Sequence, residues 1–178
     1  METKINIAEI LRNKPHGVKL YSPIFGDCTY CYIQGPTSDI CVKRQYNVMS
    51  YFNFEGLYNT AGECLLFPSK EMHNWNKFAW KKGDVLTNSS GFQIFFDKWL
   101  NEDYTEFLGK IKLLGDSHCY DTAYYTLVSE EEALEFIKNV EEINNGKLNR
   151  ETLEIEKAQP EFKDGDIIVT AGAPYLYY

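Results

Sequence analysis

The chain of 178 residues has no surplus of basic charge, because 18 lysines and arginines stand against 26 aspartates and glutamates, a formal net charge of -8. Proteins that hold a nucleic-acid backbone or an anionic membrane surface do so with clustered Lys and Arg. We therefore expect neither nucleic acid nor membrane among the partners of this protein.

Long apolar runs are also missing. No stretch approaches the ~20 apolar residues of a membrane-spanning helix. The opening Met1-Glu-Thr-Lys-Ile-Asn6 lacks the basic and then apolar layout of a signal peptide. These absences predict a cytoplasmic protein.

Neither a glycine-rich phosphate loop nor a strand-loop-helix dinucleotide fingerprint occurs in the sequence. Its 12 glycines fall at turns instead. We therefore expect no cofactor and favour a non-enzymatic protein.

Paired cysteine motifs are scarce, although there are five cysteines, an odd number that favours free thiols over a disulfide framework. Cys28 and Cys31 have the spacing of half a zinc site, but they lie in a predicted strand, where positions three apart face opposite sides. A site completed by Cys41 and Cys64 is the alternative to small buried thiols. We expect no metal.

Strand-forming segments dominate what is present. With 44% apolar and 15% aromatic residues the chain can fill a core, and short β-rich runs alternate with tight turns. The predicted strands are 18–21, 27–34, 40–44, 48–53 and 64–67 in the first half, and 84–87, 92–97, 107–114 and 124–128 in the second. Between the last two of these strands, residues 115–121 are predicted to be a polar loop.

Two helices are predicted from capping patterns. Asn6 and Glu9 form a capping box before residues 7–13, and Ser129 opens a helix over 129–145 with an apolar stripe at helical spacing. Strands this short form small twisted barrels. The predicted fold is mainly β (α+β), with two small Src-homology-three-like barrel modules, a short N-terminal helix and one longer helix in the second half.

An internal repeat divides the chain. Trp80-Lys-Lys-Gly-Asp-Val-Leu-Thr matches Phe162-Lys-Asp-Gly-Asp-Ile-Ile-Val, and Lys14-Pro-His-Gly-Val-Lys-Leu-Tyr is a looser copy. We predict an N-terminal module at 1–74, a second module at 75–160, and a partial third repeat at 161–178. Trp75 and Trp80 are expected to be buried where the first two modules meet.

The third repeat ends as a hairpin rich in tyrosine. Isolated hairpins are marginally stable in water. We therefore expect this one to dock, either on the sheet of the second module or on a neighbouring molecule, which would make a homodimer.

Several segments resemble an uncharacterised family of small β-barrel modules from gut Bacteroidales and their phages. The resemblance covers most of the chain and is most specific at Glu63-Cys-Leu-Leu-Phe-Pro-Ser-Lys70. It also includes Leu20-Tyr-Ser-Pro23 and Ser129-Glu-Glu-Glu132. The resemblance implies a phage or mobile-element origin.

One cluster has the residue types of thiol catalysis, Asp116-Ser-His-Cys-Tyr-Asp121. A cysteine activated by a histidine is the minimum for such chemistry, which makes His118 and Cys119 weak catalytic candidates. Adjacent residues seldom supply a dyad and no oxyanion partner is recognisable, so a polar loop with a bystander thiol is favoured.

The aromatic residues of the first half favour a binding function. We expect a binding or adaptor protein that recognises a protein or a small ligand through exposed rings and the loop between modules. A phage-encoded inhibitor or ligand-sequestering protein acting on host defence is one alternative, and a thiol-dependent enzyme is the other. The candidate contact residues are Ser69, Lys70, Trp75, Tyr30, Tyr32 and Tyr58.

Overall fold

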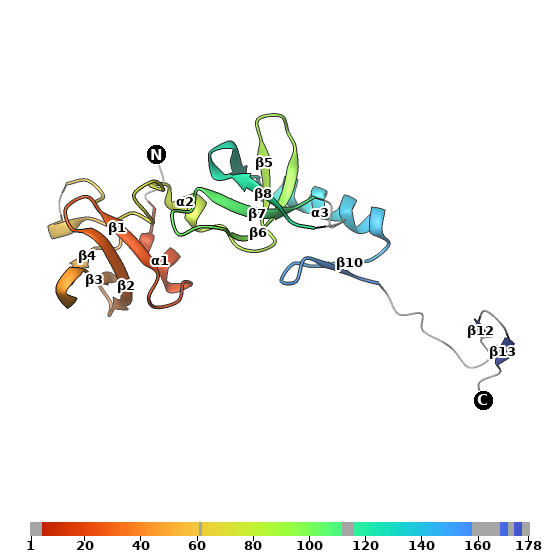
Figure 1. The fold of residues 1–178 in the computed structure, drawn as a ribbon, viewed down its shortest axis with the longest axis horizontal. Helices are drawn as coiled ribbons and strands as arrows, with labels where there is room; N and C mark the ends of the chain where they lie inside the picture. Colours follow the sequence, from red (N-terminus) through yellow and green to blue (C-terminus); the bar gives the residue numbers. More distant parts are fainter. Residues whose placement is uncertain (1–4, 61, 112–115, 158–167, 171–172, 176–178) are drawn as a thin grey trace.

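The computed structural model describes residues 5–60, 62–111, 116–157, 168–170 and 173–175. They form two antiparallel β modules in succession, each around its own core, followed by a helix and small hairpins (Figure 1). The architecture is mainly β, with a short N-terminal helix and one longer helix in the second half, which confirms the predicted fold class.

The first module is a meander in the order β1-β2-β3-β4, each strand antiparallel to the next. Helix α1 begins where the Asn6 side chain accepts a hydrogen bond of 3.0 Å from the Glu9 amide, as predicted. The elements are α1 (Ile7–Arg12), β1 (Lys19–Ser22), β2 (Gly26–Gln34), β3 (Asp39–Lys43), η1 (Gln45–Asn47), β4 (Met49–Phe52) and η2 (Tyr58–Thr60).

Residues 64–67 return to the first module but form no continuous strand. They make two isolated bridges, Leu57 with Cys64 and Tyr21 with Phe67. Tyr21 and Phe67 exchange backbone hydrogen bonds of 2.9 and 2.8 Å. Pro68 follows at once and has no amide hydrogen to extend the ladder. The prediction of a strand over the whole segment is therefore wrong.

The second module is a five-stranded sheet in the order β8-β7-β6-β5-β9. Its last strand, β9, pairs with its first strand, β5. The predicted hairpin is confirmed, since the Asn88 side chain accepts hydrogen bonds of 3.0 Å from the amides of Ser90 and Phe92. The predicted loop 115–121 is wrong over β8, which pairs with β7. The elements are α2 (Trp75–Phe78), β5 (Val85–Asn88), β6 (Gln93–Trp99), β7 (Glu106–Lys110), β8 (His118–Asp121), η3 (Thr122–Tyr124) and β9 (Tyr125–Leu127).

The two modules are built alike. Gly17 and Gly83 precede the first strand of each with φ of 90° and 86°. Their amides donate hydrogen bonds of 2.9 Å to the carbonyls of Tyr30 and Phe96 respectively. Directly after these two residues, both second strands carry a β-bulge. The same backbone devices therefore start and bend each sheet.

A helix and a hairpin extend the second module. Helix α3 (Glu130–Asn144) opens at the predicted N-cap Ser129, which forms a capping box with Glu132, and β10 (Lys147–Asn149) pairs with β11 (Glu154–Glu156). Phe136 and Val140 of α3 pack with Val85 and Phe95 in a third core. Helix α3 thus covers one face of the β5–β6 hairpin.

The tryptophans of the central stretch are both buried, as predicted, but in different cores. Trp75 is 3% exposed in the first core and Trp80 is 3% exposed in the second. Phe78 also belongs to the first core and contacts Tyr104 of the second module, with ring centroids 4.9 Å apart. The boundary predicted after residue 74 therefore does not separate the cores.

The C-terminal hairpin is present as β12 (Ile168–Thr170) and β13 (Ala173–Tyr175). These strands pair with each other and join neither larger sheet, so the predicted addition to the second sheet is wrong. Docking on a second molecule stays a prediction. The rest of the predicted third repeat, residues 161–167, 171–172 and 176–178, lies outside the described residues.

Candidate functional site

The candidate site is the outer face of the first sheet, the side that points away from the first core. Leu20, Cys28 and Val42 face that core. Because side chains alternate along a strand, their neighbours point outward. Lys19, Thr29, Lys43 and Met49 are successive cross-strand partners from β1 to β4, and they form one row across the face.

A second row exists because β2 is bulged. Tyr30 pairs with Val42 but Tyr32 pairs with Cys41, which leaves Cys31 as the extra residue. The extra residue shifts the alternation and moves Tyr32 to the outer face. Cys41 in turn pairs with Tyr51. We call Tyr32, Cys41 and Tyr51 the tyrosine row.

The tyrosine row combines a buried thiol with two accessible rings. Cys41 is fully buried, whereas Tyr32 is 41% and Tyr51 44% exposed. The two hydroxyl groups lie 3.4 Å apart. The hydrogen bond with Tyr51, and then that with Cys41, raise the pKa of Tyr32.

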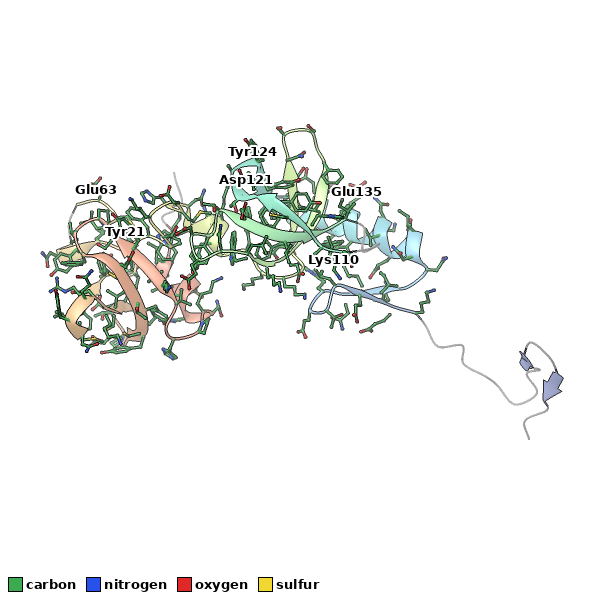
Figure 2. All side chains as sticks on the ribbon, viewed as in Figure 1. Tyr21, Glu63, Lys110, Asp121, Tyr124 and Glu135 are labelled. Carbon is green, nitrogen blue, oxygen red and sulfur yellow. The ribbon has the colours of Figure 1, made fainter. Side chains whose placement is uncertain are left out.

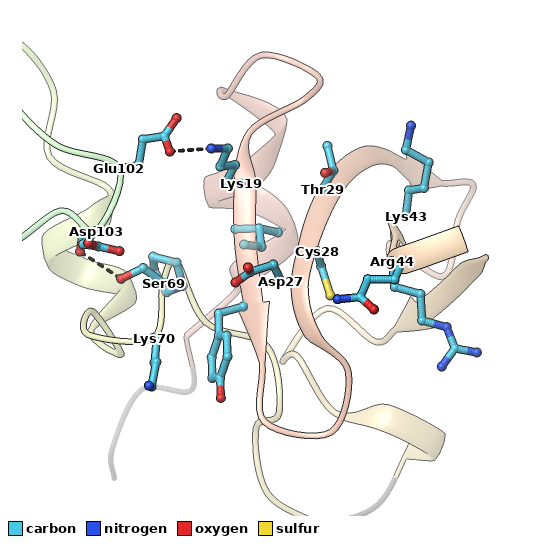
Figure 3. A pocket seen from close by; sticks show the side chains of 14 residues that line it. Lys19, Asp27, Cys28, Thr29, Lys43, Arg44, Ser69, Lys70, Glu102 and Asp103 are labelled. Atoms are coloured by element: carbon cyan, nitrogen blue, oxygen red, sulfur yellow. Dashed lines mark hydrogen bonds and ion pairs between the residues drawn. The ribbon is translucent and has the colours of Figure 1, made fainter. Parts of the chain in front are cut away.

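Beside these rows lies a groove walled by both modules, with a volume of about 400 Å³ (Figure 3). Glu102 from the β6–β7 connection forms an ion pair with Lys19, and the Ser69 hydroxyl donates a hydrogen bond of 2.8 Å to the Asp103 carbonyl. The hydrogen bond with Glu102 raises the pKa of Lys19. The charged groups lining the groove are Lys19, Lys43, Arg44, Lys70, Asp27, Glu102 and Asp103.

The Arg44 side chain packs beside the first core, because the Phe25 ring that it contacts belongs to the residues packed against that core. Its guanidinium carbon lies 4.3 Å from the centroid of the Phe25 ring, a cation-π arrangement. Its buried Nε has no hydrogen-bond partner among the described residues. The aromatic platform therefore holds the guanidinium while leaving hydrogen-bonding capacity unused.

The structure divides the predicted contact residues into two groups. Tyr30 is 4% exposed and packs in the first core, so the prediction that its ring lies on an exposed face is wrong. Trp75 is 3% exposed in the same core, which agrees with its predicted burial and removes it from the contact surface. Ser69 is buried and its hydroxyl also accepts from the Met72 amide. Tyr58 is half-buried against the Phe25 and Phe52 rings.

Only Tyr32 and Lys70 of the predicted set are both exposed and placed at the candidate site. Sequence reasoning missed Lys19, Lys43 and Tyr51. Each of them is the chain neighbour of a core residue in β1, β3 or β4, so alternation along the strand places it on the outer face. This alternating pattern is visible in the sequence.

His118 and Cys119 do not form a dyad. They are consecutive residues of β8, so their side chains point to opposite faces of the sheet, and both are exposed. No hydrogen bond joins them in the described part of the chain. Cys28 is another free thiol, and it is buried. Burial raises the pKa of Cys28 to about 11, which disfavours the thiolate that nucleophilic chemistry uses.

Within the described ranges, no group of three His, Cys, Asp or Glu side chains is placed to hold a metal ion. Over the same ranges, every helix is too short or too polar to cross a bilayer. The sequence matches no protein-family model, and neither a curated protein nor a solved structure is significantly similar to it.

Proposed function

We propose that this protein is a non-enzymatic binding protein that recognises a partner through the outer face of its first module. The observation that carries the proposal is the contrast between equivalent faces. In the second module α3 covers Val85 and Phe95 on the outer face of the β5–β6 hairpin, whereas the equivalent Lys19 and Thr29 of the first module lie under no described helix, and Tyr32 and Tyr51 on the same face are exposed. A face with exposed rings beside charged groups is typical of a protein interface.

A photo-crosslinking residue placed at position 51 tests this proposal in the cells that express the protein. The matched control is the same residue at position 124, because Tyr124 is 72% exposed on the second module (Figure 2). We expect a crosslinked species at position 51 that is absent at position 124. Crosslinks of equal yield at both positions, or none at position 51, would contradict the proposal.

The captured partner is then purified and titrated against three forms of the protein. Lys43→Glu reverses a charge in the middle of the face, and Leu127→Ala removes an apolar side chain that is 54% exposed on the second module. We expect the affinity to fall at least tenfold for Lys43→Glu and to be unchanged for Leu127→Ala.

A further inference from the structure

We propose that the outer face of the first module binds an acidic amphipathic helix of a protein partner, in the manner in which α3 covers the second module. This inference rests on the proposed function and specifies the partner. Its first support is the equivalence of the two sheets. Val85 and Phe95, which α3 covers, pair across β5 and β6, just as Lys19 and Thr29 pair across β1 and β2.

Helix α3 shows how such a module receives a helix. The Phe136 ring lies over the Phe95 ring with centroids 5.1 Å apart, and Val140 is 1% exposed beside it. The opposite side of α3 is solvated, and its first turn consists of Glu130, Glu131 and Glu132. A module of this topology therefore presents a surface on which an amphipathic helix can lie.

The dimensions of the first face suit a helix. The tyrosine row runs from β2 to β4 and spans about 10 Å, since neighbouring strands lie about 4.8 Å apart. A helix with its side chains is about 10 Å wide. An added strand would instead pair with the outer edge of β4 and leave the middle of the face uncovered.

Apolar anchoring groups are available on this face. Tyr32, Met49 and Tyr51 are each about two-fifths exposed. Their rings and methyl groups offer the contact area that an apolar helix stripe needs.

The charge of the face determines the sign of the partner. Lys43 forms no ion pair with any described residue, although the chain as a whole carries a net charge of -8. Asp27 and Asp103 also line the groove, and the register places Asp27 on the side of Thr29 away from Tyr32. Lys43 lies next to Met49 in the register, so cationic and apolar groups alternate within a few ångströms. A helix with carboxylates beside its apolar stripe is complementary to this arrangement.

A peptide-display selection against the full-length protein tests the inference. Three libraries are used: 17-residue acidic amphipathic helices with the apolar spacing of α3, the same helices with lysine in place of glutamate, and extended peptides with alternating apolar residues. Binders that also bind the double variant Lys43→Glu/Tyr51→Ala are removed. We expect enrichment of the acidic helical library alone.

Selected peptides are then synthesised and titrated. We expect the double variant to bind at least tenfold more weakly, Leu127→Ala to bind as the unchanged protein does, and the affinity to fall several-fold when salt is raised from low to physiological concentration. Enrichment of the lysine or extended library overturns the acidic-helix inference while leaving face-dependent crosslinking at position 51 intact. Enrichment of no library also overturns it, and crosslinking then decides the proposed function separately.

Discussion

The outer faces of the β1–β2 and β5–β6 hairpins occupy the same place in two similar modules, yet they differ in the side chains that decide what covers them. Val85 and Phe95 are apolar and lie under α3, whereas Lys19 and Thr29 are polar and uncovered by any described element. The inner faces are alike, because Leu20 and Leu86 both point into their cores. A repeated fold can thus keep its core while one copy becomes a scaffold for a helix and the other stays open.

The largest expected effect comes from Phe136→Ala, which uncovers the second module. The ring is 8% exposed and contacts Phe95, so its loss leaves a cavity beneath α3. We expect the free energy of unfolding to fall by about 3 kcal/mol. Urea unfolding of Phe136→Ala and of Phe92→Ala, an exposed ring 41% accessible, measures the difference. Equal midpoints would show that α3 does not stabilise the sheet.

The two opening glycines provide a matched pair. Both have positive φ, so alanine at either position costs about 1 kcal/mol of backbone strain. A Cβ at Gly17 meets open space, whereas one at Gly83 would lie 2.7 Å from the Arg150 carbonyl oxygen of the β10–β11 hairpin. We expect Gly83→Ala to lower the stability by about 1 kcal/mol more than Gly17→Ala does, because the backbone must shift. Thermal unfolding of the two variants compares their stabilities. A larger loss of stability for Gly17→Ala would contradict the expected clash between a side chain at position 83 and the Arg150 carbonyl oxygen.

The bulged residues differ in charge, which predicts a difference in acid sensitivity. Asp97 is the extra residue of β6 and Cys31 that of β2. Burial acts to raise the pKa of Asp97, but the ion pair of 2.8 Å with Lys82 and the hydrogen bond from Ser117 outweigh it and lower the pKa.

A lowered carboxyl pKa stabilises the fold above the unfolded-state value of about 4, and this contribution is lost as the pH falls through the lower folded-state value. We expect Asp97→Asn to reduce the fall in stability between pH 6 and pH 3, and Cys31→Ser to leave that fall unchanged. Urea midpoints across this range are the measurement. If the urea midpoint of Asp97→Asn depended on pH as that of the unchanged protein does, ionised Asp97 would not stabilise the fold.

The smallest expected effect is on stability at the candidate site itself. Tyr51 and Lys43 are exposed, so Tyr51→Ala and Lys43→Glu should each change the free energy of unfolding by no more than about 0.5 kcal/mol. Both variants should keep the far-ultraviolet circular dichroism of the unchanged protein. A large loss of stability would mean that these side chains serve the fold, and the binding experiments would need gentler substitutions.

Local signals predicted the fold well where a side chain fixes the backbone. The hairpin at Asn88 and the helix opening at Ser129 both depend on a side-chain oxygen that accepts nearby amide hydrogens, and both were predicted. Strand β8 was missed because none of its side chains is buried, so it shows no apolar alternation. Long-range pairing with β7, which local sequence does not encode, defines it.

The candidate site was only partly predictable. Tyr30 and Tyr32 have the same spacing as any two residues on one strand face, so alternation alone places them together. The bulge at Cys31 separates them, sending Tyr30 into the core and Tyr32 to the surface. The partners of Ser69 and Lys19 come from the β6–β7 connection of the other module. Local sequence patterns do not predict contacts between residues so far apart in the chain.

The groove exists only while both modules are folded, because Lys19 and Asp27 form one wall and Glu102 and Asp103 form another. Trp75 and Trp80 anchor the short connecting helix α2 in the two separate cores. A ligand in the groove would therefore bind only molecules in which both modules are folded. By mass action its binding would make the unfolding of the first module depend on that of the second, so that occupancy could be measured as increased thermodynamic cooperativity between the modules.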